Sequence, residues 1–250
     1  MDEDQHEFPD QRESPRPVRL PGGAPPPREP HELHHHESPD VVDDAVDIFG
    51  AEAAAAQLVE RLEHMSPGAA ELAEDGRRLL SPPFASDRDR IDGSERAQST
   101  LVVFGAFGTP SSRPLGDLLR SLREEHVNTV RIAWRHYPDP AAHPRAAILA
   151  LAAEAGASLH RFWPIANELL RLRHDDPRDL HAALLRAGLD PRRTFDAMRA
   201  GTGIDRVVDD VTSARASGVM FSPSLFVNGE QYRGELDPTA VSAALIDESG

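Results

Sequence analysis

The C-terminal part of the sequence predicts an α/β fold, and three observations support this expectation. Residues 100–104 (TLVVF) form a short, almost wholly apolar run of the kind that makes a buried central strand. Residues 115–125 place leucines on one face of a helix, and residues 129–134 (TVRIAW) form a second strand. Strand, helix and strand in this order indicate a βαβ unit.

The residues after this unit are helical in pattern before strands return. The stretch from about 141 to 217 shows helical periodicity, broken mainly at glycine and proline. Residues 219–227 then form a strand, Asn228-Gly229 is a strong hairpin signal, and residues 231–233 form the returning strand. A final helix follows. The expected order is therefore βαβ, helical insertion, ββα.

The N-terminal part divides into three further segments by composition. Residues 1–40 are rich in Pro, Glu, Asp and His and lack apolar periodicity, so they are expected to be disordered. Residues 41–80 form a helical segment, in which 69–80 is the weaker helix. Its apolar face must pack on the C-terminal domain or on another protein, and the sequence leaves both open. A polar linker over 81–98 leads to the domain at 99–250.

The net charge of −15 belongs mainly to the N-terminal part. Acidic residues outnumber basic ones by 13 in residues 1–98 and by 2 in residues 99–250. An acidic leader repels nucleic acid and anionic membranes, so neither is an expected partner. The sequence has no apolar run long enough for a membrane span, and its first ten residues do not resemble a secretory signal. A cytoplasmic protein is the expectation, with its oligomeric state open.

The chain contains no cysteine. This excludes disulfides, catalysis by a protein thiolate and cysteine-ligated metals. The histidine-rich stretch at residues 31–37 (HELHHHE) has no spacing that fixes a coordination geometry, so it is interpreted as a solvated polar tract. No metal site is expected.

Two motifs carry a resemblance to a known family. Residues 104–112 (FGAFGTPSS) match the pattern F-x-x-F-x-C-P-x-C, with Pro110 kept and with Thr109 and Ser112 at the cysteine positions. Residues 218–229 (GVMFSPSLFVNG) match G-V-x-G-T-P-T-F-F-V-N-G. Both patterns are hallmarks of DsbA-like thioredoxin-fold proteins, which the chain resembles over about 160 residues. The helical insertion is typical of that fold.

A third stretch extends the resemblance toward the N-terminus. Residues 87–93 (DRDRIDG) are similar to the entry of thioredoxin domains in actinobacteria, some of which are appended to sodium/proton antiporters. In the family, the proline equivalent to Pro223 follows a cis peptide bond, and its neighbours pair with an extended substrate segment. The resemblance therefore implies a groove for a protein or peptide segment.

The family's redox chemistry does not carry over to this chain. Disulfide exchange needs a thiolate, and the hydroxyls of the degenerate motif Thr109, Pro110, Ser111 and Ser112 cannot supply one. No catalytic residue is expected. The expected ligand-binding residues are Phe107, Thr109, Ser112, Ser222, Pro223 and Ser224.

Two main function classes remain open. The first is a non-catalytic adaptor or chaperone-like module that needs no cofactor and holds a peptide in the groove. The second is an enzyme resembling kappa-class glutathione transferases and their related isomerases, in which the Thr109 or Ser112 hydroxyl donates a hydrogen bond to the thiolate of glutathione or another small thiol. A purely structural role for a degenerate paralogue also stays open.

Single polar and aromatic residues outside the motifs are assigned ordinary roles. His136 and His143 are expected to be packed or solvated rather than catalytic. Trp134 and Trp163 are expected in the core. Arg135 is expected to form a surface ion pair.

Overall fold

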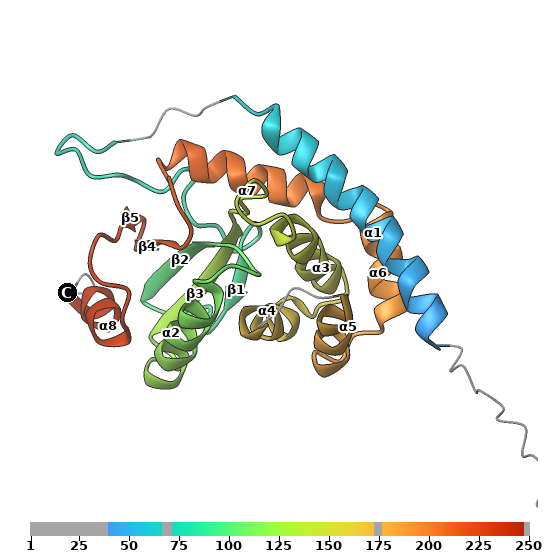
Figure 1. The fold of residues 1–250 in the computed structure, drawn as a ribbon. Coiled ribbons are helices and arrows are strands. Elements are labelled where there is room, and N and C mark those ends of the chain that lie inside the picture. Colours follow the sequence, from blue (N-terminus) through green and yellow to red (C-terminus); the bar gives the residue numbers. More distant parts are fainter. Residues whose placement is uncertain (1–39, 67–71, 173–176, 248–250) are drawn as a thin grey trace, which may run out of the picture. The chain divides into compact units, whose positions relative to one another are not determined.

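A five-stranded mixed sheet forms the centre of the fold in the computed structural model, which describes residues 40–66, 72–172 and 177–247. The strand order is β1-β3-β2-β4-β5; β2 and β3 run parallel, and the other neighbours run antiparallel (Figure 1). Every residue of β2 is buried, as a central strand requires. The strands are β1 (Arg90–Asp92), β2 (Ser99–Gly105), β3 (Val130–His136), β4 (Ser224–Val227) and β5 (Glu230–Gln231).

Helices cover both faces of this sheet. Leu101 and Val103 of β2 belong to a core shared with α2, α3, α4 and α8, whereas Val102 and Phe104 face the other side, toward α7. This alternation follows from the period of two along a strand. The helices are α1 (Asp40–Glu63), α2 (Ser112–Glu125), α3 (Ala146–Ser158), α4 (Phe162–Arg171), α5 (Pro177–Arg186), α6 (Pro191–Arg199), α7 (Ile204–Ala216) and α8 (Pro238–Asp247).

The predicted order of elements is confirmed. The sequence β2-α2-β3 is the βαβ unit, α3 to α7 form the helical insertion, and β4-β5-α8 is the ββα unit. The hairpin turn is at Asn228 and Gly229, whose φ angles are 48° and 95°, and Asn228 Oδ1 also accepts a hydrogen bond from the Thr100 amide. The strand predicted over 219–227 is shorter, because β4 begins at Ser224. Predictions for residues 1–39, including the histidine-rich stretch, lie outside the described residues.

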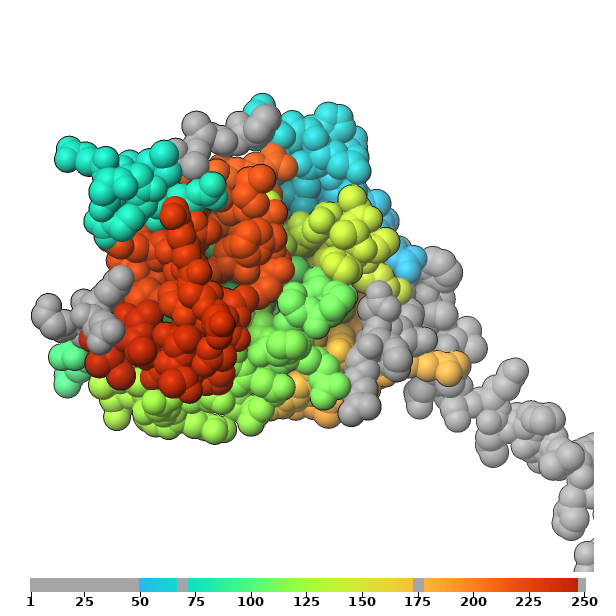
Figure 2. Space-filling model, turned by 60° about the vertical axis from the view of Figure 1, so that its left-hand side comes forward, coloured from blue at the N-terminus to red at the C-terminus, as the bar shows by residue number. Residues whose placement is uncertain are grey.

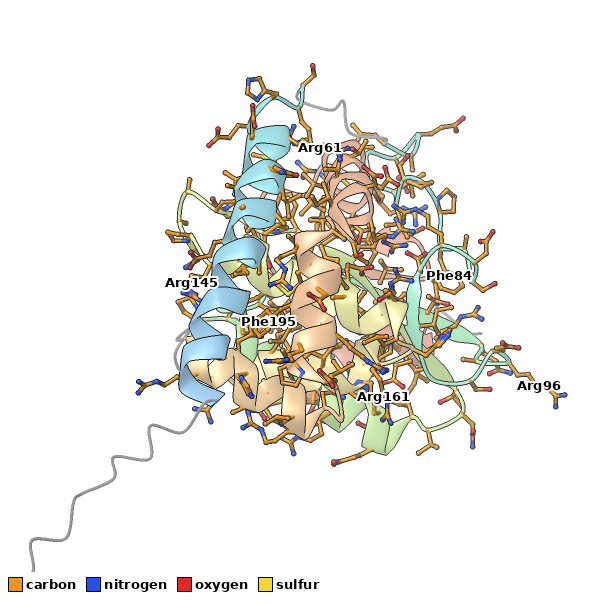
Figure 3. The ribbon with its side chains drawn as sticks, turned by 90° about the vertical axis from the view of Figure 1, so that its right-hand side faces the viewer. Arg61, Phe84, Arg96, Arg145, Arg161 and Phe195 are labelled. Atoms are coloured by element: carbon orange, nitrogen blue, oxygen red, sulfur yellow. The ribbon has the colours of Figure 1, made fainter. Side chains whose placement is uncertain are left out.

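Helix α1 packs on the domain instead of standing free. Its apolar stripe of Ala51, Ala54, Leu58 and Leu62 is buried. The helix contacts α3, α6 and α7, and Figure 3 shows it running alongside α6, with Phe195 labelled on that helix. Of the two covers that the sequence left open for this apolar face, the structure shows the packing on the C-terminal domain.

Residues 72–98 differ from the sequence-based expectation. Residues 72–80 are not helical; they form isolated bridges from Leu72 to Arg78 and from Leu79 to Glu230 beside the β4–β5 hairpin (Figure 2). Residues 81–98 are not a free linker, because β1 pairs with β3 there and Asp89 is buried. Four of its charged residues form ion pairs with the rest of the fold, so its polar composition does not indicate a linker; they are Arg88, Asp89, Arg90 and Asp92.

Candidate functional site

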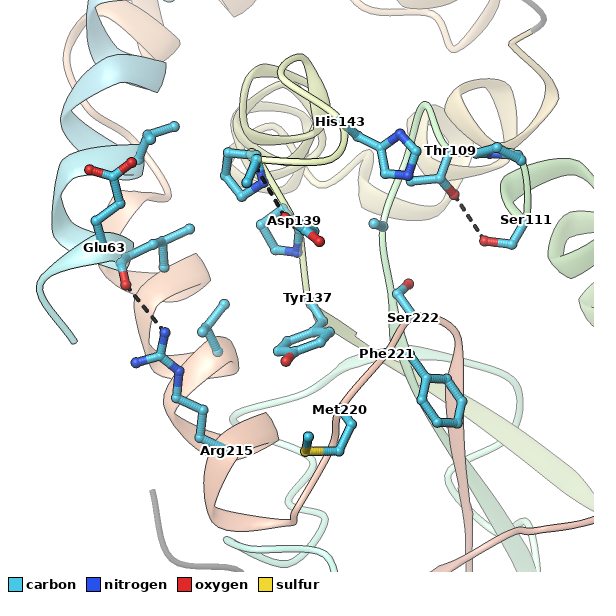
Figure 4. A pocket seen from close by; sticks show the side chains of 18 residues that line it. Glu63, Thr109, Ser111, Tyr137, Asp139, His143, Arg215, Met220, Phe221 and Ser222 are labelled. Atoms are coloured by element: carbon cyan, nitrogen blue, oxygen red, sulfur yellow. Dashed lines mark hydrogen bonds between the residues drawn. The ribbon is translucent and has the colours of Figure 1, made fainter. Parts of the chain in front are cut away.

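A cavity of about 530 Å³ opens where the predicted motifs meet (Figure 4). Thr109, Pro110 and Ser111 line it from the degenerate motif, and Ser222 lines it from the loop before β4. Met220 and Phe221 of the same loop also line it, and the remaining walls come from Ala106, from residues 137–141 and 143 after β3, and from side chains of α1 and α7. The structure therefore brings two motifs that lie far apart in sequence to one groove.

The three hydroxyls of the degenerate motif are bonded to one another. Ser112 Oγ lies 3.2 Å from the carbonyl oxygen of Ala106, so Ser112 must be the donor there. Thr109 Oγ1 lies 3.1 Å from Ser112 Oγ and 2.9 Å from Ser111 Oγ. Since a hydroxyl has a single proton, all of these contacts are hydrogen bonds at once when Thr109 donates to Ser112 and Ser111 donates to Thr109. All three motif protons are thereby engaged within the protein.

Ser112 also completes the backbone of this turn. Its Oγ accepts a hydrogen bond of 3.0 Å from the amide of Thr109, and its side chain is buried at the start of α2. One hydroxyl thus ties together the two backbone groups of Thr109 and Ala106. This is a structural role, because the Ser112 hydroxyl could not bind a reacting group without breaking these hydrogen bonds.

The loop before β4 presents a different surface to the groove. The Ser222–Pro223 peptide bond is cis, as predicted. Met220 and Phe221 are 75% and 64% exposed, and Ser222 Oγ is buried with no hydrogen-bond partner among the described residues. Ser224 Oγ donates to the carbonyl of Phe221 at 2.8 Å and so holds the loop in place.

Three backbone amides of the same loop are also unpaired. In the part of the chain that the structure describes, no hydrogen bond uses the amides of Met220, Phe221 or Ser222. Backbone amides of this kind are strong donors that normally find a partner. They are available to an extended chain laid along the loop, as in β-strand addition.

The opposite wall of the groove combines aromatic and charged side chains. Tyr137 donates to the carbonyl of Val219 at 3.3 Å, and burial raises the pKa of Tyr137. Arg215 of α7 donates to the carbonyls of Leu62 at 3.2 Å and Met65 at 2.7 Å, and thus fastens the C-terminal end of α1 to the groove.

A buried network supports the motif from behind. Phe107 stacks on Trp134, with ring centroids 4.7 Å apart. Trp134 Nε1 donates to His136 Nδ1 at 3.3 Å, so the His136 proton is on Nε2, which donates to Glu154 at 3.0 Å. Burial alone would raise the pKa of Glu154, but hydrogen bonds from His136 and Arg90 outweigh it and lower that pKa to about 2.

A second buried pair fixes the segment before β1. Arg135 is fully buried and binds both carboxylate oxygens of Asp89, at 2.7 and 2.9 Å. It also donates to the carbonyls of Pro82 and Pro83 at 2.8 and 3.1 Å. Burial would raise the pKa of Asp89, but the Arg135 guanidinium lowers it overall. The prediction of a surface ion pair for Arg135 is wrong, because residues 82–89 cover it.

The predicted site residues separate into two groups, apart from Pro223, which is half-buried and does not line the cavity. Thr109, Pro110, Ser111 and Ser222 line the cavity. Phe107, Ser112 and Ser224 are buried beneath it, where they shape the site without facing it. Among the other assignments, Trp134 and His136 are buried, His143 lines the cavity, and Trp163 is half-buried under the guanidinium of Arg123.

Sequence reasoning missed Met220, Phe221 and the contribution of α1 to the groove. The signal for the first two was present, since two large apolar residues directly precede the proline loop. For α1 the apolar stripe was visible, but its neighbours in space were not. Among the described residues, no group of three or more His, Asp or Glu side chains is placed to hold a metal ion.

Comparison with known proteins agrees with this geometry. A family model described as thioredoxin matches residues 85–248. The chain belongs to the thioredoxin family. A sodium/proton antiporter NhaA 1 of Mycolicibacterium gilvum is 33% identical over 173 residues, which is 68% of this chain but 28% of the antiporter. The chain thus spans little more than a quarter of the length of that relative. No helix among the described residues meets the length and apolarity needed to cross a bilayer.

Solved structures show that the thioredoxin fold here is DsbA-like. Oxidised BdbD from Bacillus subtilis superposes with a TM-score of 0.61 at 16% identity, covering 69% of this chain and 98% of BdbD. Wolbachia pipientis α-DsbA1 gives 0.56 at 13% identity, covering 68% and 94%. At these identities the likeness concerns the fold alone. The thioredoxin family and its DsbA-like fold are thus confirmed for the chain.

Proposed function

We propose that the chain is a non-catalytic thioredoxin-family module that binds an extended peptide segment of another protein in the groove beside Pro223. It is a pseudoenzyme in this proposal, since thiol–disulfide exchange needs a thiolate that the chain does not have. Its task is that of an adaptor or a chaperone-like holder.

The observation that carries the proposal is the unpaired loop at Met220–Ser222. The loop combines exposed apolar side chains with backbone amides and a buried Ser222 hydroxyl that have no hydrogen-bond partner among the described residues. An extended chain would bury the apolar side chains and accept hydrogen bonds from the amides. In this mode the backbone hydrogen bonds give affinity and the side-chain pockets give selectivity.

Peptide binding by the full chain tests this proposal. The probe is a short fluorescein-labelled peptide that alternates Val and Phe with Ser, and its affinity is measured by fluorescence anisotropy. The double variant Met220→Ser/Phe221→Ser should weaken binding about tenfold, because two apolar contacts are lost. The matched control Val127→Ser/Leu185→Ser also removes two exposed apolar side chains, but away from the groove, and should bind like the parent. Equal affinity of both variants would overturn the proposal.

The second candidate is a glutathione-type thiol enzyme, and one observation favours it. Thr109 and Ser111 line a cavity at the N-terminus of α2, where the helix dipole favours a bound thiolate. Before the Thr109 hydroxyl could donate to a bound thiolate, it would have to break its hydrogen bond to Ser112. This cost favours the peptide-binding module.

A titration with reduced glutathione separates the two candidates. Isotope-labelled full-length chain is followed by amide shifts up to millimolar ligand. Saturable shifts confined to residues 109–112 and 222–224, and lost in Thr109→Val, would support the enzyme. The peptide-binding proposal expects no saturable shift.

The proposal places the protein in the cytoplasm, following the sequence-based expectation. A groove without cysteine binds in the same way in reducing and oxidising compartments, so the binding function does not depend on this location. Fractionation of the native host, with detection of the full chain, tests the location directly.

A further inference from the structure

A second cavity continues the groove along α1. It has a volume of about 440 Å³ and lies between α1 and the start of α3. It shares Val59 and Glu63 with the first cavity, so the two adjoin. Its apolar lining consists of Ala55, Ala56, Val59, Pro144 and Ile148.

The wall of this extension lies outside the segment that matches the thioredoxin family model. The matched thioredoxin segment covers residues 85–248, and α1 precedes it. Figure 3 shows Arg145, which borders the second cavity, beside α1 on the side away from α6. Helix α1 therefore packs its buried stripe on the domain and turns a second face toward the groove.

This second face of α1 is acidic. Glu52, Glu60 and Glu63 line the second cavity, and all three are exposed. Their spacing places them on one side of the helix. Among the described residues, none of the three carboxylates forms an ion pair. Asp139 adds a fourth carboxylate at the first cavity.

Two arginines border the same groove but do not neutralise it. Arg215 directs its guanidinium to the carbonyls of Leu62, Met65 and Ser66. Its position shows that the C-terminal end of α1 accepts a cation, as the helix dipole predicts. Arg145 is the second of these arginines, and it borders the second cavity. Four carboxylates against two guanidinium groups leave the groove with an excess of negative charge.

We propose that the α1 extension makes the groove selective for peptide segments whose apolar residues are flanked by Lys or Arg. The inference rests on the proposed peptide binding at the loop before β4 and names its partner class. The apolar residues of the segment lie on Val59, Ile148 and the exposed Phe221, and its basic side chains face the glutamates of α1.

The test compares three labelled peptides on the full chain. They share the alternating Val/Phe core and carry two Arg, two Gln or two Glu residues at each end. The Arg-flanked peptide should bind about tenfold more tightly than the Gln-flanked one, because several solvated ion pairs act together. This advantage should shrink in high salt, whereas the affinity of the Gln-flanked peptide should not fall.

A pair of charge-matched variants locates the effect. Glu52→Gln/Glu60→Gln/Glu63→Gln should remove the advantage of the Arg-flanked peptide and leave the Gln-flanked peptide unchanged. The control Glu95→Gln/Glu124→Gln/Glu235→Gln changes the net charge equally at exposed sites outside both cavities, and should keep the advantage.

The outcomes separate this inference from the function on which it rests. If the Gln-flanked peptide binds but both variants keep or both lose the Arg preference, the α1 inference is overturned and peptide binding stands. If none of the three peptides responds to Met220→Ser/Phe221→Ser, the proposed function itself fails, and the inference fails with it.

Discussion

The two loops that face each other across the groove are built in opposite ways. In the motif loop, a chain of hydrogen bonds runs from Ser111 to Thr109, from Thr109 to Ser112 and from Ser112 to the Ala106 carbonyl. In the loop before β4, the amides of residues 220–222 and the Ser222 hydroxyl have no partner among the described residues. The motif loop, which would carry the cysteines in a redox-active relative, has its hydroxyl groups hydrogen-bonded within the protein here. The loop before β4, where we propose that a peptide binds, has unpaired donors. This difference supports the proposal that the site binds a peptide and carries out no redox chemistry.

Both loops adjoin the central sheet, at the end of β2 and the start of β4, and disturbing the buried ion pairs at this sheet should have the largest effect. Arg135 and His136 are the last two residues of β3, which pairs with β2, the strand that leads into the motif loop. Arg135→Met removes both hydrogen bonds that Arg135 donates to the buried Asp89 and leaves Arg88, at 3.2 Å, as the guanidinium still bonded to it, so the free energy of unfolding should fall by about 3 kcal/mol or more. Urea denaturation measures the change. Arg131→Met, at a half-buried arginine of the same strand, is the control and should cost about 1 kcal/mol or less. Equal losses in both variants would contradict the account.

The Glu154 network should make the base sensitive to acid. The folded pKa of about 2 lies below the ordinary value of 4.5, so this carboxylate contributes stability above pH 4.5. The contribution should be lost as the pH falls toward 2, and it amounts to about 3 kcal/mol in total. Unfolding free energies across this range measure it. Glu154→Gln should flatten the fall; an unchanged pH profile in that variant would show that other groups are responsible.

The closed loop should respond to the loss of Ser112 in stability, not in binding. Ser112→Ala leaves the Thr109 amide and the Ala106 carbonyl without their partner and should cost about 1–3 kcal/mol of unfolding free energy. Ser111→Ala removes the outer end of the chain and should cost about 0.5 kcal/mol or less. Both variants should bind the Val/Phe peptide like the parent. A Ser112→Ala variant of full stability but weak binding would place Ser112 in the binding surface instead.

The open loop should show the reverse behaviour and the smallest change in stability. Met220→Ser/Phe221→Ser removes two exposed side chains, so its unfolding free energy should stay within about 0.5 kcal/mol of the parent. Its peptide affinity should still fall. A large loss of stability would mean that these side chains support the fold, and the contrast between the two loops would disappear.

The fold and the motif positions were predictable because local patterns encode them. Apolar runs, helical periodicity and Asn228-Gly229 each depend on a few neighbouring residues. Pairing across long sequence distances was not predictable. Asp89 appeared to belong to a linker, since nothing nearby in sequence shows that it pairs with Arg135. The orientation of the hydroxyl protons and the groove wall contributed by α1 likewise depend on the three-dimensional arrangement.

The most direct test of the central claim is a titration of isotope-labelled full-length chain with the Val/Phe peptide, followed through every assigned amide. The account predicts saturable shifts at residues 220–222, whose amides gain partners, with smaller shifts along the groove wall near Val59 and Tyr137. Thr109 and Ser112 should keep their hydrogen bonds. No saturable shift at residues 220–222, or shifts that saturate at 109–112 with glutathione, would contradict it.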